Sequence, residues 1–285
     1  MNKITTKPTL EYDSNPFTLS IKGLGLLIEY AKGVFIALLI FGMLGLVLNI
    51  FSYIPSDNNS NTTSSYSSTE ASDTNSLVNG SNVVEWGVVV SVTLVIIGAL
   101  IVIFFVAVFL SALYYGVVAS GAVSASEKRM ITLGEAFSEM GERLGALFKA
   151  EIIINLKIIG GLLLFIVPGI RAALRYQSTP YIIMKNKEIS ATDAINSSKD
   201  LYKGHLMESF GIMTVGAIIP FIGSAVSASG MAMSIQQLTA YKESNLVTPK
   251  THWLNYIGLI ILALFFLIIF SITAITIAVL INSTN

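Results

Sequence analysis

Long apolar runs with almost no charge most constrain what this chain can fold into. Residues 33–54, 86–115 and 254–281 can each cross a hydrocarbon core of about 30 Å, which needs about 20 helical residues. Hydrophobic residues make up 53% of the sequence and charged residues 12%, against about 25% charged residues in soluble domains. The sequence therefore predicts an all-α integral membrane protein.

Composition also excludes several function classes. Lys+Arg and Asp+Glu balance at 17 each, so net charge indicates no nucleic-acid partner. The chain has no cysteine, which excludes disulfides, thiol catalysis and cysteine metal sites. The two histidines, His205 and His252, lack neighbours at metal-ligand spacing, and no common catalytic or nucleotide-binding motif is present. We therefore expect no enzyme activity and no cofactor.

The pattern divides the chain into five regions. A helix signal at Asn15-Pro16 ends a polar tail that contains no cleavable signal peptide. Residues 56–82 are rich in Ser, Asn and Thr and predict a flexible loop, in which glycosylation of Asn58, Asn61 and Asn79 stays open. The regions are the tail (1–16), an amphipathic helix with the first span (17–55), the loop (56–82), a membrane core (83–244) and an additional span (245–285).

Basic residues predict the orientation in the membrane. No Lys or Arg lies between Lys32 and Lys128, so both flanks of that region are expected in the cytoplasm and the loop outside. We therefore expect a multi-pass protein of the plasma membrane, with a cytoplasmic N-terminus and an extracytoplasmic C-terminus.

Two amphipathic helices are predicted on the cytoplasmic side. In residues 131–148, Thr132 and Glu135 form a capping box, and apolar residues recur on one face. This helix is expected to lie flat on the membrane or against the inner ends of the spans. Residues 190–203 form the second, which Ser190 caps and Gly204 ends.

Proline and glycine predict two tight hairpins within the membrane core, at Pro168-Gly169 and at Pro220 to Gly223. With the first hairpin, every basic residue lies inside or within a span. Whether 170–184 and 206–219 cross fully or are re-entrant stays open. The expected fold is a bundle of about seven segments, given that a crossing needs about 20 residues: 33–54, 86–115, 150–167, 170–184, 206–219, 222–241 and 254–281.

Three segments carry a family resemblance: IVPGIRAALRYQSTPYIIM at 166–184, AINSSKDLYKGH at 194–205 and LTAYKES at 238–244. They resemble a prokaryotic family that includes the YciC-like membrane proteins and the membrane domain found beside glycerophosphodiester phosphodiesterases. The resemblance covers residues 20–244 and implies a span ending in a Val-Pro-Gly-Ile turn, followed by a short returning helix. It implies no activity, and the phosphodiesterase catalytic domain is absent from these residues.

Three basic residues within predicted spans are candidates for anion or lipid contact. Arg171 and Arg175 share one helix face, and charge within a bilayer generally faces a partner or water. The alternative is that both snorkel to the outer headgroups. For Lys157 the alternatives are snorkelling, an internal pair with Glu208, or transport.

Small residues in 222–241 predict tight helix packing, with a serine-lined pore as the alternative, and Gly42 and Gly45 predict packing in the first span. Together these patterns favour a membrane helper, scaffold or lipid-contacting module. A permease or exporter component for an amphiphile or anion is the second hypothesis, and a membrane-embedded lipid enzyme is the third. The expected partners are membrane lipids, other membrane proteins or further copies of the chain.

Overall fold

The computed structural model describes residues 12–52, 81–247 and 249–283, and throughout these ranges the regular structure is helical. Nearly all of the predicted Ser-rich loop lies outside the described residues, as do Asn58, Asn61 and Asn79. The helices follow in the order α1 (Pro16–Tyr30), α2 (Lys32–Ser52), α3 (Ser81–Ser126), α4 (Leu133–Leu164), α5 (Ile166–Tyr176), α6 (Thr179–Lys185), α7 (Ala191–Leu201), α8 (Leu206–Ile218), α9 (Gly223–Glu243), the 3₁₀ helix η1 (Trp253–Tyr256) and α10 (Ile257–Ser283).

A helical body forms one part of the molecule. It contains α1, the second half of α3, α4 and α6 to α9, and its core includes the fully buried side chains of Leu27, Ile183 and Tyr202. Several of these helices begin at the capping residues that the sequence predicts. Asn15 caps α1, Thr132 and Glu135 form the capping box of α4, and Ser190 caps α7.

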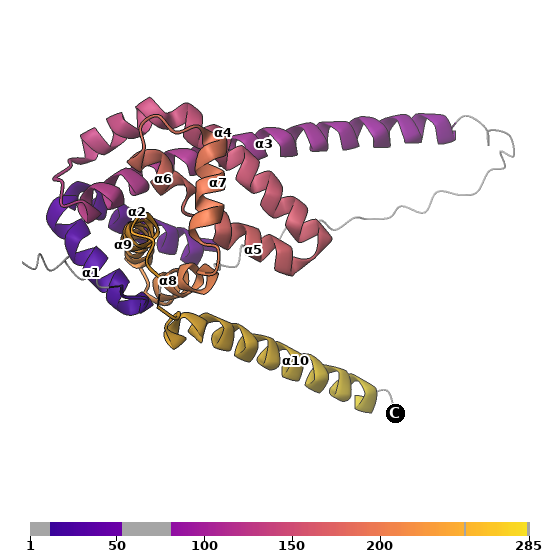
Figure 1. The fold of residues 1–285 in the computed structure, drawn as a ribbon. Helices are drawn as coiled ribbons and strands as arrows, with labels where there is room; N and C mark the ends of the chain where they lie inside the picture. The colour runs from indigo at the N-terminus through magenta and orange to yellow at the C-terminus, as the bar shows by residue number, and fades with distance from the viewer. Residues whose placement is uncertain (1–11, 53–80, 248, 284–285) are drawn as a thin grey trace, which may run out of the picture.

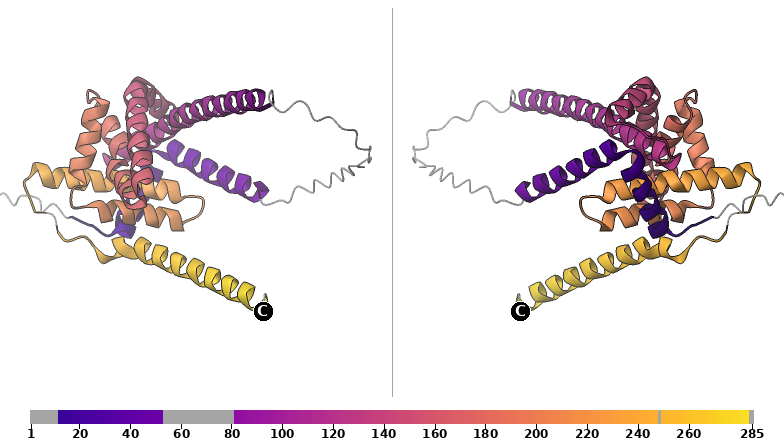
Figure 2. Two further views of the ribbon diagram at one scale, coloured as in Figure 1. Left: turned by 90° about the vertical axis from the view of Figure 1, so that its right-hand side faces the viewer. Right: turned by 90° about the vertical axis from the view of Figure 1, so that its left-hand side faces the viewer.

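Three apolar helices extend from one side of this body. Figure 2 shows α2, α3 and α10 projecting in the same general direction, with the C-terminus at the far end of α10. Val88–Ser126 and Trp253–Ile281 are long and apolar enough to cross a membrane, and α1 with α2 adds a third candidate that is bent by 115°. Large apolar side chains along the projecting parts of α3 and α10 are exposed. These surfaces match a hydrocarbon environment better than water.

Within the described ranges, the structure does not confirm a bundle of about seven crossing helices, a number that rests on a crossing length of about 20 residues. Helix α4 joins the predicted surface helix 131–148 to the predicted third span, because no helix-breaking residue separates them. Figure 1 shows α4 curving over the body before it runs beside α5. The predicted span 170–184 is divided between α5 and α6, and α8 is short for a crossing.

The first hairpin turns earlier than Pro168-Gly169. Helix α4 ends at Leu164, Phe165 is extended (φ −162°, ψ 150°), and α5 begins at Ile166. Pro168 therefore lies in the first turn of α5, where a missing N–H removes no helical hydrogen bond. Gly169 serves close packing instead, because a Cβ on Gly161 would lie 2.9 Å from the Gly169 Cα.

The second turn spans Ile219 to Ile222, so it contains Pro220, and Gly223 is the first residue of α9. Phe221 has a positive φ of 66°. A Cβ on Gly42 would collide with the Phe221 carbonyl oxygen, so this turn lies against the middle of α2. The packing prediction holds for Gly42, but nothing lies within 4 Å of a Cβ on Gly45.

Candidate functional site

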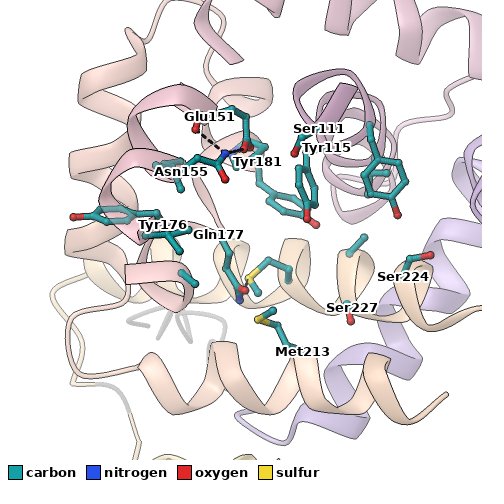
Figure 3. A pocket seen from close by; sticks show the side chains of 18 residues that line it. Ser111, Tyr115, Glu151, Asn155, Tyr176, Gln177, Tyr181, Met213, Ser224 and Ser227 are labelled. Atoms are coloured by element: carbon teal, nitrogen blue, oxygen red, sulfur yellow. Dashed lines mark hydrogen bonds between the residues drawn. The ribbon is translucent and has the colours of Figure 1, made fainter. Parts of the chain in front are cut away.

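A cleft of about 400 Å³ lies among α3, α4, α5, α6, α8 and α9 (Figure 3). Its floor is buried and includes Ile154, Tyr181 and Met231, whereas Tyr115 and Met213 at its rim are exposed. The volume falls within the range of small-molecule sites, about 300–1,000 Å³. This cleft is therefore a candidate binding site.

Glu151 is the charged residue of the cleft. Its side chain is only 7% exposed, and among the described residues its hydrogen-bonding partner is Asn155. The Asn155 Nδ2 donates to the Glu151 main-chain oxygen at 2.8 Å and to the Oε2 at 3.3 Å. The two residues are four apart on α4, so they share one face of the helix. Among the residues that the structure describes, neither Lys nor Arg lines the cleft with them.

Aromatic and polar side chains surround this carboxylate. In Figure 3 the Glu151 side chain lies beside Tyr181, with Tyr176 and Gln177 on one side and Tyr115 on the other. Gln177 is held in place because its amide nitrogen donates to the Ser209 hydroxyl. Further hydroxyls come from α3 and α9, at Ser111, Ser224 and Ser227.

Of the three predicted basic residues, Lys157 contacts a residue that lines the cleft. Its Nζ is 4.8 Å from the ring centre of Tyr176, a cleft residue, in a cation–π contact. It does not pair with Glu208, whose carboxylate bonds to other residues, so that suggested pair is wrong. Lys157 itself is exposed, and its snorkelling to the headgroups stays a prediction.

Arg171 and Arg175 do not line the cleft. The cleft face of α5 carries Ala173, Tyr176 and Gln177, and at about 100° per residue the two arginines lie on the far side of the helix. In the part of the chain that the structure describes, neither guanidinium forms an ion pair. The structure therefore does not join the three basic residues into one site.

The small residues of α9 mostly serve packing. A Cβ on Gly23 of α1 would lie 2.6 Å from the Ser229 carbonyl oxygen, and Ser229 is buried. Ser224 and Ser227, nearer the start of α9, instead face the cleft. The helix thus packs tightly against α1 and places two serines on the cleft, and the serine-lined pore stays a prediction.

A second polar cluster connects the N-terminal segment and η1 to the helical body through hydrogen bonds. Glu208 on α8 is buried, the Tyr12 hydroxyl donates to its Oε2 at 2.5 Å, and the His205 Nδ1 lies 2.9 Å from its Oε1. Burial and the neighbouring carboxylate of Glu208 raise the pKa of Tyr12 well above its usual range, so its hydroxyl remains a donor. Asn255 donates to the Ser14 main-chain oxygen at 2.7 Å.

Sequence reasoning missed both groupings. Tyr115, Tyr181 and Gln177 carry no shared motif, and helical spacing indicated a common face only within single helices, for Glu151 with Asn155 and for Ala173 with Tyr176 and Gln177. In the described ranges, no group of three His, Asp or Glu residues could hold a metal ion. Comparison with protein-family models, curated proteins and solved structures finds no match to this chain.

Proposed function

We propose that this chain is a non-enzymatic integral membrane protein that acts as a lipid-contacting helper or scaffold. Helices α2, α3 and α10 cross the bilayer, and the α4–α5 and α8–α9 hairpins enter it from the cytoplasmic side without crossing. The observation that carries the proposal is the common direction of the three apolar helices from one side of the body (Figure 2). The seven predicted segments then become three crossings and two re-entrant hairpins.

The tip of the α4–α5 hairpin supports insertion. Leu163 is 84% exposed and Phe165 is 74% exposed, and their neighbours from Leu162 to Val167 are exposed and apolar. In water this surface would be unfavourable, whereas lipid chains would cover it. The hairpin therefore belongs in the membrane more readily than in solvent.

The position of the α8–α9 turn sets the depth of the second hairpin. Phe221 in this turn lies against Gly42, and Gly42 follows Lys32 at the start of α2. The helical rise between these two residues is about 15 Å, which is half of a hydrocarbon core of about 30 Å. The turn then reaches the middle of the bilayer, which supports a re-entrant hairpin.

The distribution of charge agrees with this orientation. The α4–α5 turn at Phe165 and the α8–α9 turn at 219–222 contain no charged residue. Four of the connections at the opposite helix ends carry basic residues, whereas the α5–α6 connection at 177–178 carries none. The basic residues are Lys128 and Arg129 before α4, Lys187 before α7, Lys203 before α8 and Lys250 before η1. The positive-inside rule then assigns these connections to the cytoplasm.

The alternatives receive less support. Transport past Lys157 would require this residue to face an internal cavity, but it does not line the cleft and stacks on Tyr176. A lipid enzyme would require two titratable groups converging on a substrate, whereas Glu151 is the single carboxylate among the described cleft residues. The resemblance of 166–184 to the YciC-like family stays a prediction that agrees with a non-enzymatic role.

Cysteine accessibility tests the topology, because the native chain contains no cysteine. In intact cells, a membrane-impermeant maleimide should label Ser283→Cys at the end of α10 and should label Lys187→Cys only after permeabilisation. Phe165→Cys at the hairpin tip should react with a lipid-soluble maleimide and resist the impermeant reagent from both sides.

As the control, the impermeant maleimide should label Ser283→Cys and Lys187→Cys equally in permeabilised membranes. Labelling of Lys187→Cys from outside would reverse the orientation. Reaction of Phe165→Cys with the impermeant reagent in intact cells would show that the α4–α5 hairpin crosses fully. Release of the protein by alkaline carbonate would contradict the membrane proposal itself.

A further inference from the structure

We infer that the cleft around Glu151 binds the ammonium group of an amphiphile, such as the ethanolamine headgroup of a lipid in the cytoplasmic leaflet. This inference rests on the proposed membrane function and names the ligand class of the candidate site. A carboxylate that is 7% exposed lies in a cleft where its described hydrogen-bonding partner is the neutral amide of Asn155.

Burial without a cationic partner is costly for a charged carboxylate and favours its protonated form, so a cation that enters the cleft would stabilise the charged form. The described cleft residues include no Lys or Arg, and Lys157 forms its contact with the Tyr176 ring. An ammonium ligand would supply the missing positive charge. An anionic ligand at the same place would meet the like charge of Glu151.

The aromatic residues favour the same ligand class. Tyr115, Tyr176 and Tyr181 come from three different helices and line one cleft with Glu151 (Figure 3). Aromatic rings attract ammonium groups through their negative faces, and quaternary ammonium ligands are often bound by aromatic cages. Met213 and Met231 add polarisable apolar surface that suits N-methyl or methylene groups.

The depth of Glu151 fits a headgroup. From Glu151 to Leu164 at the end of α4, the helical rise amounts to about 20 Å. If the apolar tip reaches just past the middle of a core of about 30 Å, Glu151 lies at the cytoplasmic headgroup level. The exposed rim residues Tyr115 and Met213 leave the cleft open, so a lipid chain can remain outside it while the ammonium group enters.

Binding to the purified full-length protein in nonionic detergent tests the inference. Native mass spectrometry would measure the binding of phosphatidylethanolamine and of phosphatidylglycerol with identical acyl chains. A titration with choline would test whether a soluble ammonium ion binds. We expect phosphatidylethanolamine to bind more tightly, and Glu151→Gln to weaken its binding by about tenfold or more. Binding of choline that Glu151→Gln abolishes would support the ammonium site and identify a soluble ligand as its source.

Matched variants separate this site from general effects. Glu142→Gln on the exposed face of α4 should leave phosphatidylethanolamine binding unchanged. Tyr115→Phe should bind phosphatidylethanolamine normally, and Tyr115→Leu should bind it weakly, because only the leucine lacks an aromatic ring. The melting temperature of each variant would confirm that it is folded.

Unchanged phosphatidylethanolamine binding in Glu151→Gln would overturn the inference. So would tighter binding of phosphatidylglycerol that depends on Lys157, because that result would identify an anion site. Either result, with the cysteine accessibility pattern intact, would leave the membrane proposal standing. Failure of the accessibility pattern would instead count against the membrane proposal and leave the measured binding unaffected.

Discussion

Replacing Gly23 with valine should destabilise the protein by about 2–3 kcal/mol, because the new side chain enters a contact between main chains. A Cβ at this position would lie 2.6 Å from the Ser229 carbonyl oxygen and 2.7 Å from the Ser229 carbonyl carbon. A main-chain atom cannot rotate aside as a side chain can, so α1 and α9 would have to separate. The expected readout is a fall of several degrees in the thermal unfolding midpoint in detergent.

Gly25 provides a matched control on the same helix. Nothing lies within 4 Å of a Cβ at Gly25, and the residue is exposed. Gly25→Val should therefore leave the midpoint unchanged or raise it slightly, because glycine is the poorer helix former by several tenths of a kcal/mol. Equal losses in the two variants would disprove the tight α1–α9 packing.

Local helix signals were predictable because they depend on neighbours in the sequence. Asn15, Thr132 and Ser190 each place a side-chain acceptor before a helix, and each caps the helix that follows. Gly204 adopts a positive φ of 90° shortly after α7 ends. These features require no knowledge of tertiary contacts.

The division into spans was less predictable. The change from an amphipathic to an apolar pattern near Ala150 suggested two elements, but hydropathy alone does not end a helix, and α4 continues. Pro168 suggested a turn, although proline is also favoured in the first turn of a helix, where the structure places it. Each signal was compatible with two structures, and tertiary packing decided between them.

The candidate cleft could be predicted only in part. Glu151 and Asn155 are four apart, so their proximity follows from helix geometry. Tyr115, Gln177 and Tyr181 join them from other helices, and their approach depends on how α3, α5 and α6 pack around α4. The arginines illustrate the converse, since Arg171 and Arg175 stand out in the sequence yet lie away from the cleft.

Replacing Glu208 with alanine should have the largest effect on stability, a loss of about 3 kcal/mol or more, because it removes a buried carboxylate and leaves several partly buried polar groups without their acceptor. The carboxylate accepts from the Tyr12 hydroxyl at 2.5 Å and from the Thr251 hydroxyl at 3.4 Å, and it lies 2.9 Å from the His205 Nδ1. These partners come from the N-terminal segment, the α7–α8 connection and the segment before η1. Hydrogen exchange at residues 12–15 and 249–256 should therefore accelerate along with the loss of global stability.

Controls distinguish this network from a general effect of removing charge. Glu243→Ala, on an exposed residue at the end of α9, should change stability by less than about 0.5 kcal/mol. Glu208→Gln retains an acceptor oxygen and should lose less than Glu208→Ala. If Glu208→Ala and Glu243→Ala had the same stability and the same hydrogen exchange, Glu208 would not hold these two segments against the body.

A double-mutant cycle isolates the contact between Tyr12 and Glu208. Tyr12→Phe removes the donor, and in the native background it leaves the Glu208 carboxylate with one acceptor position unfilled. In the Glu208→Ala background the same change should cost much less, because the hydroxyl no longer has its partner. The cost of Tyr12→Phe should differ between the two backgrounds by about 1 kcal/mol or more, as is typical of residues in contact. Equal costs would show that the two side chains act independently.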